Sequence, residues 1–335
     1  MRVRHDPDRE RSGLSDLTMR ALGVVLLVAI SAVASAQYPN RPIKLVVPYA
    51  PGGGTDVLGR LIALELTNTL GQPMVVENRG GGGSNIGGEV VAKSAPDGYT
   101  LLIQNSTFAI NASVFPNLPF DTIADFSPVI MVASVPTMLA VNAAVPARNV
   151  FELINLLKAE PGKYTYASCG NGSPQQLAAE LLKRMTGTEM THVPYKGCAP
   201  ALADVVGGQN PISFNTAANT LPHVKSGKLR ALAVTSKDRF ALAPEIPPIA
   251  EAANLPDFDV GQWFGVLAPA KTPNDAIAKL NSAIAQMLAK RPIQERMLAQ
   301  GFAPTTGTPE AFAAVIRSDV ERWGKLVRSI GIKPE

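Results

Sequence analysis

The sequence predicts an α/β protein with mainly parallel sheets, long enough for about two domains. Short apolar runs, typical of strands buried on both faces, alternate along the chain with helix-like segments. Such alternation is typical of βαβ units, in which successive strands run parallel. The chain has 335 residues, 46% hydrophobic and 17% charged, which suits a globular protein with a large core.

The individual elements follow from local signals. Asn149 opens a capping-box-like helix start, and Ser173, Thr272 and Thr308 each precede a proline at a first helical position. We expect the chain to cross between domains near 135–146, where prolines break an extended apolar run, and again near 256–263. The predicted strands are 43–49, 74–78, 99–104, 164–168, 190–195, 211–215 and 229–235.

Residues 1–36 have the pattern of a secretory signal peptide. Arg20 precedes the apolar stretch 21–33, and the small residues at 34–36 form an A-x-A cleavage site. This stretch is shorter than the roughly 20 residues of a spanning helix. We therefore expect cleavage near Ala36 and export from the cytoplasm. Two alternatives stay open: residues 1–18 are an over-extended start before an initiator Met19, or the segment is an uncleaved anchor.

Composition and motifs argue against several classes of function. The net charge of +4 is spread thinly, so we expect no nucleic-acid partner and no basic membrane patch. The phosphate-loop motif and the dinucleotide-binding motif are both absent, and no G-x-S-x-G elbow occurs. The two histidines of the mature chain, His192 and His223, lack metal-ligand spacing. We therefore predict no metal, no cofactor and no catalytic residue.

Three glycine-rich loops lie between predicted elements. The first glycine loop is 51–56, the second is 79–88, and the third is 168–174. Loops at the carboxyl ends of parallel strands are where ligands bind in α/β sheets. A helix N-terminus adds unpaired N–H groups and about +0.5 of charge, so the first and third loops can each hold a carboxylate or phosphate without a basic side chain. Each loop is also compatible with a plain strand–helix turn.

Two reactive side chains have structural interpretations. His192 lies within an apolar strand, which favours a hydrogen-bonded core histidine. Cys169 could act as a nucleophile beside His192 or His223, but the sequence shows no third group to orient such a pair.

Seven short motifs, taken in order, resemble those of the extracytoplasmic solute receptors of tripartite tricarboxylate transporters, often called the Bug family. The first runs from Tyr38 to Asp56 and ends in Ala-Pro-Gly-Gly-Gly-Thr-Asp. The resemblance covers essentially the whole mature chain. The other matching stretches are 75–79 with 85–87, 95–102, 170–172, 192–197, 227–235 and 263–269.

The resemblance implies a two-domain Venus flytrap fold, the periplasmic-binding-protein fold. Domain I would comprise 37–138 and 261–335, and domain II would comprise 139–260. A small organic carboxylate would bind in the cleft between them and be delivered, unchanged, to the membrane permease subunits. The resemblance also implies a periplasmic monomer.

The same resemblance implies a set of ligand-binding residues on both domains. Asn215 stands where many members carry an acidic residue, which favours plain organic acids over amino acids as ligands. The implied set is Tyr49, Ala50, Gly53, Gly54, Thr55, Asp56, Ser106, Thr107, Ser168, Gly170, Asn171, Gly172, Ser173, Tyr195, Lys196 and Asn215.

The two cysteines stand where many members of the family have serine or another small residue. Cys169 follows the strand predicted at 164–168, and Cys198 follows the one at 190–195. If the intervening helix is a crossover, both sulfurs lie at the same end of the sheet, beside the cleft. We predict a Cys169–Cys198 disulfide, with two free thiols as the alternative.

Two other functions remain to be weighed against a transport receptor. A sensor that presents its closed form to a signalling partner would need the same hinge and cleft. An exported hydrolase of small esters would need a base within reach of Ser168, Ser173 or Cys169, and the sequence shows none.

Overall fold

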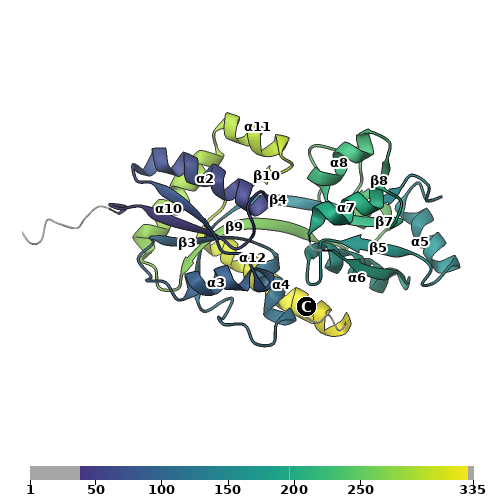
Figure 1. Ribbon diagram of the computed structural model, residues 1–335, viewed down its shortest axis with the longest axis horizontal. Helices are drawn as coiled ribbons and strands as arrows, with labels where there is room; N and C mark the ends of the chain where they lie inside the picture. Colours follow the sequence, from purple (N-terminus) through teal and green to yellow (C-terminus); the bar gives the residue numbers. More distant parts are fainter. Residues whose placement is uncertain (1–37, 196, 331–335) are drawn as a thin grey trace, which may run out of the picture. The chain divides into compact units, whose positions relative to one another are not determined.

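The computed structural model describes residues 38–195 and 197–330 (Figure 1). From Arg41 onward the chain forms one compact unit. The predicted signal peptide and its alternative start at Met19 lie outside the described residues, as does Lys196. Within the described part, no helix is long and apolar enough to cross a membrane.

Every predicted strand is present, with ends shifted by two residues at most. The observed strands are β1 (Ile43–Val47), β2 (Met74–Asn78), β3 (Thr100–Asn105), β4 (Phe126–Asn142), β5 (Thr165–Ser168), β6 (Thr191–Pro194), β7 (Ile212–Thr216), β8 (Leu229–Val234), β9 (Gly261–Pro269) and β10 (Ala303–Pro304). The helices are α2 (Gly54–Leu70), α3 (Asn85–Ala92), α4 (Thr107–Val114), α5 (Val150–Ala159), α6 (Pro174–Thr186), α7 (Cys198–Val206), α8 (Ala217–Lys225), α9 (Ile249–Ala252), α10 (Asn274–Leu288), α11 (Arg291–Ala299) and α12 (Pro309–Ile330).

The strands form a continuous hydrogen-bonded series in the order β2-β1-β3-β9-β4-β7-β5-β6, with β8 and β10 also paired to β4. The strands β1, β2 and β3 are parallel, and so are β5, β6 and β7. The strands β4, β8, β9 and β10 join antiparallel. The predicted α/β fold is therefore observed, with parallel outer strands on both sides and antiparallel strands joining them at the centre.

The segment interpreted from sequence as the first crossing is part of the long strand β4. β4 pairs with β9 from Phe126 to Pro136, and with β7 and β8 from Thr137 to Asn142. The prolines do not break the strand. Pro136 falls where the partners change, a position that tolerates a residue without an N–H. The division into domains at 138 and 261 stays a prediction.

Helix α12 packs into the hydrophobic clusters on both sides of this change of partners. Its first half places Phe312 and Ile316 in a cluster with Trp263 of β9. The second half of the helix places Trp323 and Leu326 in a cluster with Tyr166 of β5, on the other side of the change of partners. In Figure 1, α12 (yellow) lies beside α4, in agreement with the contacts between these helices.

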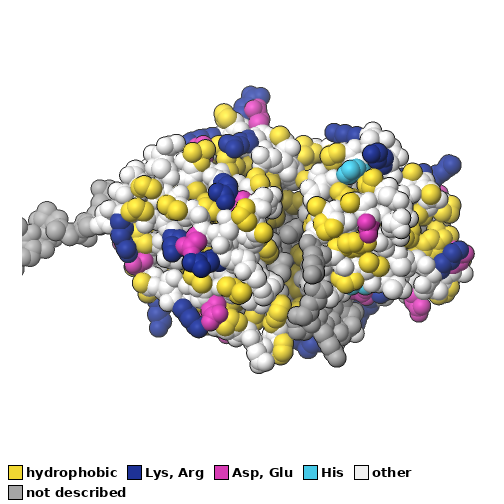
Figure 2. All heavy atoms as spheres, in the orientation of Figure 1, with side chains coloured by type: hydrophobic (Ala, Val, Ile, Leu, Met, Phe, Trp, Pro, Cys, Tyr) yellow, Lys and Arg dark blue, Asp and Glu magenta, His cyan; other side chains and the backbone are white. Residues whose placement is uncertain are grey.

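Charged side chains are distributed over the surface in pairs. On the face drawn in Figure 2, Lys and Arg side chains lie scattered among Asp and Glu. Exposed ion pairs such as Arg41–Asp97 and Lys325–Glu321 join residues that lie side by side on the surface. Pairs of this kind contribute about 0–1 kcal/mol each, so the apolar clusters are the main source of stability.

A glycine in β9 allows α12 to approach the sheet closely. A Cβ atom at Gly265 would lie 2.2 Å from Cζ of Phe312 and 3.0 Å from the carbonyl oxygen of Ile130. We expect Gly265→Ala to lower the free energy of unfolding by about 1–3 kcal/mol, because the core is overpacked. Urea denaturation followed by circular dichroism measures the loss.

The matched control for this substitution is Gly261→Ala in the same strand. A Cβ atom at Gly261 would meet nothing within 4 Å. It should change the free energy of unfolding by less than about 0.5 kcal/mol. Equal effects of the two substitutions would contradict the packing argument.

Candidate functional site

The first glycine loop leads into a helix whose first turn has no side-chain cap. α2 begins at Gly54, and its N-cap residue is Gly53, in an extended conformation. Because glycine has no side chain, the N–H groups of the first turn lack the acceptor that Ser, Thr, Asp or Asn would supply. Gly53 and Gly54 are exposed, whereas Thr55 is buried. An anion at this turn would meet backbone donors directly.

The carboxylate of Asp56 holds the loop in place. It accepts hydrogen bonds from the backbone N–H of Gly52, from Nε of Arg60 and from Nδ2 of Asn78, each at 2.9 Å. Burial raises the pKa of Asp56, but these bonds outweigh it and leave the pKa below its ordinary value. The expectation that Asp56 contacts a ligand is therefore corrected: its side chain is 2% exposed and its oxygens are occupied.

Amides and hydroxyls at the ends of β1 and β3 orient Thr55. The hydroxyl of Tyr49 donates to Oε1 of Gln104 at 2.9 Å and to Oδ1 of Asn105 at 3.2 Å. The N–H of Thr107 also donates to Oδ1 of Asn105, which directs Nδ2 of that amide toward Oγ1 of Thr55 at 3.4 Å. Thr55 accepts this bond, so its own O–H proton is left for another acceptor.

Ser106 has a structural role. Its side chain is fully buried, and its hydroxyl accepts a hydrogen bond from the N–H of Trp263 at 2.9 Å. The expectation that it lines a cleft is corrected for this reason. Thr107, the first residue of α4, is half-buried beside it.

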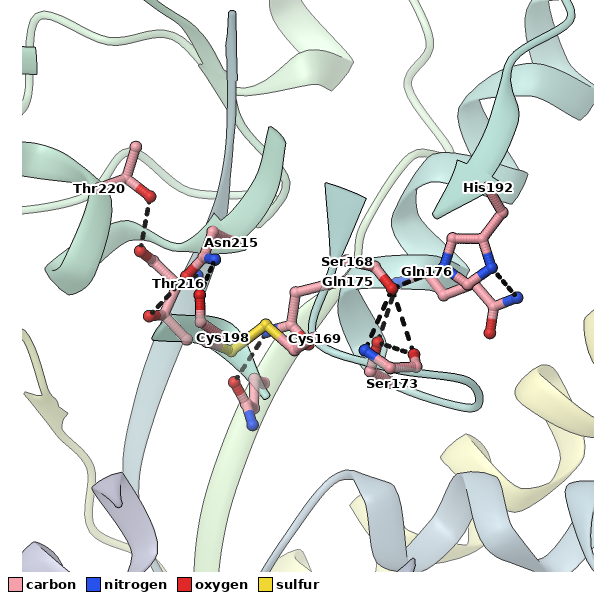
Figure 3. Close-up of a disulfide and its surroundings, with 12 residues drawn as sticks. Ser168, Cys169, Ser173, Gln175, Gln176, His192, Cys198, Asn215, Thr216 and Thr220 are labelled. Carbon is pink, nitrogen blue, oxygen red and sulfur yellow. Dashed lines mark hydrogen bonds between the residues drawn. A yellow bond between two sulfur atoms is a disulfide. The ribbon is translucent and has the colours of Figure 1, made fainter. Parts of the chain in front are cut away.

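The third glycine loop is saturated by its own hydrogen bonds (Figure 3). Ser173 is the N-cap of α6: its hydroxyl accepts from the N–H of Gln176 at 3.2 Å and donates to the carbonyl of Gly170 at 2.7 Å. Gly170 and Gly172 have φ values of +124° and +71°, which favour glycine. A Cβ atom at Gly170 would also lie 3.0 Å from the carbonyl oxygen of Tyr195.

A side-chain relay supports this loop from the side of β6. The N–H of Gly172 donates to Oε1 of Gln176 at 2.8 Å, which directs Nε2 of the amide toward Nδ1 of His192 at 3.2 Å. Nδ1 must then accept, so the imidazole proton is on Nε2 and is donated to Oγ of Ser168 at 2.7 Å. Ser168 is fully buried. Its predicted role as a direct ligand contact is corrected to a support of the loop.

His192 is hydrogen-bonded within the protein, as the sequence predicted, but it is half-buried on the edge strand β6 and not in the core. Its ring stacks on Tyr166 with centroids 4.8 Å apart. Burial lowers the pKa of His192 to about 4, with Glu180 acting in the opposite direction and Lys183 in the same one. The ring is therefore neutral at pH 7 and donates, rather than accepts, toward Ser168.

The predicted disulfide is confirmed: Cys169 and Cys198 are bonded, with their Cα atoms 4.3 Å apart. Cys169 follows β5 and Cys198 begins α7, and β5 and β6 are parallel neighbours as expected. Among the described residues there is no free cysteine. The alternatives of two free thiols and of a Cys169 nucleophile are therefore wrong.

Two further predicted ligand residues have partners within the protein. The hydroxyl of Tyr195 donates to Asp204 and accepts from Asn210, both at 2.6 Å, and burial with the Asp204 carboxylate raises its pKa to about 12. Asn215 is fully buried and donates to the carbonyl of Cys198 at 2.8 Å. Both side chains are thus engaged within the protein, and their roles as ligand contacts stay predictions.

Contacts between the two halves bring the loops near each other. Gly172 of the third loop lies against Val114 at the end of α4. The first residue of this helix, Thr107, donates to Asn105 beside the first glycine loop. The helix is about 10 Å long between Thr107 and Val114. A Cβ atom at Gly301 would lie 2.0 Å from that of Ala218 in α8, and the ring of Phe302 lies beside Gly54.

Several residues of the site were missed in the sequence. Gln104, Asn105 and Gln176 orient the loops, and Gln175 of α6 donates to Oε1 of Gln262 in β9 at 3.4 Å. Asn105 could have been found, because it is a polar residue at the carboxyl end of a strand. Gln176 carries the signal of a capping box, a glutamine three residues after the N-cap Ser173, but Gln175 carries none.

Comparisons with known proteins agree with this geometry. The family described as tripartite tricarboxylate transporter family receptor matches residues 58–332. The protein BugT of Bordetella pertussis is 39% identical over 319 residues, covering 94% of this chain and 98% of that protein. The chain belongs to this receptor family.

Solved structures of other proteins extend the comparison. An R. palustris protein solved with adipate is 36% identical with a TM-score of 0.79, and the match covers 89% of this chain and all of that one. MatC of Rhodopseudomonas palustris, solved with malate, is 32% identical with a TM-score of 0.75, covering 87% of this chain and all of that one.

The depressed pKa of His192 predicts a pH dependence of stability. Between about pH 6.5 and 4 the unfolded chain binds a proton that the folded chain does not, so the free energy of unfolding falls as the pH falls. The full difference would be about 3 kcal/mol, and we expect about 1–3 kcal/mol because the ring is half-buried. Urea unfolding at pH 7.5, 5.5 and 4.5 measures it.

Substituting His192 separates its contribution to the pH dependence of stability from that of the carboxylates, which also titrate in this range. His192→Gln should be less stable at pH 7.5 but should lose less stability on acidification than the unsubstituted protein. His223→Gln on α8 is the control and should leave the pH profile unchanged. Parallel profiles for all three proteins would refute the assignment.

Proposed function

We propose that the protein is an extracytoplasmic receptor that binds a small carboxylate between the first and third glycine loops and delivers it to a tripartite tricarboxylate-type permease. The observation that carries the proposal is the uncapped first turn of α2, with Thr55 held so that it can donate. Membership of the family supports the transport role.

The first loop offers a site for a carboxylate without a basic side chain. The helix N-terminus carries about +0.5 of charge, and several backbone N–H groups point the same way. The nearest acidic group, Asp56, is neutralised by Arg60 and buried beneath the loop. We place the ligand against Tyr49, Ala50, Gly53, Gly54, Thr55 and Thr107.

The third loop would contact the other end of the ligand on its exposed side. Ser168 and Ser173 are engaged in supporting the loop, which leaves the segment Gly170–Gly172, with Asn171 exposed, as the contact surface. The relatives solved with adipate and malate support a dicarboxylate. We propose a plain organic diacid as the ligand class.

Binding would close two domains about the segments that join them. The change of partners in β4 at Pro136–Thr137 and the return of the chain at Gly261 support boundaries at 138 and 261. Export through a cleaved signal peptide at 1–36 fits relatives described as periplasmic. We propose a periplasmic monomer.

A sensor without transport remains the second candidate, since it would use the same site. The ester-hydrolase alternative is disfavoured by a specific observation. Ser168 has a histidine at 2.7 Å, which the sequence did not predict, but that imidazole donates its proton to the serine and is oriented by an amide. A catalytic base would have to accept the serine proton.

Substituting the N-cap residue tests the site at α2. Gly53→Asp would place a carboxylate on the N–H groups of the first turn, and its extended backbone and open surroundings accept a side chain. We expect this variant to be as stable as the unsubstituted protein or slightly more so, and to lose carboxylate binding. A thermal-shift screen with adipate, malate, citrate, benzoate and glutamate measures both.

Gly53→Ala is the matched control, because it adds a Cβ atom without an acceptor. Protein that has been unfolded and refolded, to remove carried-over ligand, should gain about 2.7 kcal/mol at 100 times the dissociation constant of a ligand. The control should keep this gain. Binding that persists in Gly53→Asp would exclude the α2 site, and the absence of any shift in the unsubstituted protein would count against a carboxylate receptor.

A further inference from the structure

The disulfide joins the loop after β5 to the start of α7, which follows β6 (Figure 3). We propose that the Cys169–Cys198 bond is a positioning element of the binding site, which fixes the third glycine loop in its ligand-contacting conformation. This inference rests on the proposed function. The inference goes beyond the proposed function by assigning the disulfide a role in ligand affinity rather than in the stability of the fold.

The disulfide and one hydrogen bond together connect the carboxyl-end regions of β5, β6 and β7. Cys169 lies between the last residue of β5 and Gly170, and Cys198 is the first residue of α7. The carbonyl of Cys198 accepts from Nδ2 of Asn215, and Oδ1 of Asn215 accepts from the N–H of Thr216 at 2.9 Å, directly before α8. A displacement of α7 would therefore be transmitted to the third loop and to the start of α8.

The backbone hydrogen bond between the third loop and the chain after β6 is long: the N–H of Tyr195 donates to the carbonyl of Ser168 at 3.3 Å. α7 has Gly197 at its N-cap with a φ of +118° and no side-chain cap. The covalent bond thus ties the third loop to a helix start that no side chain caps.

The bond lies outside the hydrophobic clusters of this half. The clusters contain Tyr166 and Leu177 on one face of the sheet and Ala167 and Leu202 on the other, and neither contains a cysteine. Both cysteines are half-buried. Loss of the bond should therefore loosen residues 168–174 while the sheet keeps its packing.

The double variant Cys169→Ser/Cys198→Ser tests the proposal. Hydrogen exchange followed by mass spectrometry should show amides of 168–174 and 197–200 exchanging at least about tenfold faster, with β4 unchanged. The dissociation constant for adipate or malate, measured by calorimetry at 15 °C, should rise about tenfold because the site is no longer preorganised.

A second variant separates affinity from general stability. Leu157→Ala removes a fully buried side chain of α5, which precedes the start of β5, whereas the third loop follows the end of β5. It should weaken the fold and leave both the loop exchange and the dissociation constant unchanged. Unchanged exchange at 168–174 in the double serine variant would overturn the proposal, as would faster exchange with unchanged affinity. The two proposals fail in different experiments. The proposed function fails if the thermal-shift screen shows that the unsubstituted protein binds neither diacid. The positioning role fails if hydrogen exchange at 168–174 is the same with and without the disulfide.

Discussion

The long strand β4 is the constraint on which the rest of the structure depends. Its 17 residues pair with β9 and β10 on one side of Pro136 and with β7 and β8 on the other. Because buried backbone groups must be paired, both halves depend on the register of this one strand. The parallel strands on either side then direct their carboxyl ends, and the loops that follow them, to the site.

The two glycine loops present backbone donors in different ways. The first leads into α2 with no capping side chain, so donors remain at the helix start. The third is capped by Ser173, supported by the neutral ring of His192 and tied to α7 by the disulfide. One loop thus offers positive helix-end charge, and the other a fixed surface, which together suit a small anion that must be held and released.

Neutral groups dominate the described part of this site. Asp56, in the first turn of α2, is paired with Arg60, and His192 is neutral because burial lowers its pKa. In the proposed function, binding by backbone dipoles and hydroxyls would avoid the strong attraction of a buried cation, and release to a permease would be correspondingly easier. This balance accords with membership of a transporter receptor family.

The sequence by itself determined the elements and their chemistry. Apolar runs located seven strands, capping residues located the starts of α5 and α6, and the positions of Cys169 and Cys198 after neighbouring strands indicated the disulfide. These features depend on residues close together in the chain, or on the simple rule that parallel strands end together. The sequence also indicated that His192 is hydrogen-bonded within the protein, although it is half-buried on β6 and not in the core.

Only the tertiary structure decided which polar groups remain available to a ligand. Asp56 and Tyr195 follow strands, and Ser168 and Asn215 lie at the carboxyl ends of strands, as ligand-binding residues do, but each is occupied by a partner 4–24 positions away. The prolines of β4 concealed a strand that pairs on both edges with segments about 75–140 residues distant. The backbone hydrogen bonds of such pairings join distant segments, so a local sequence pattern does not predict them.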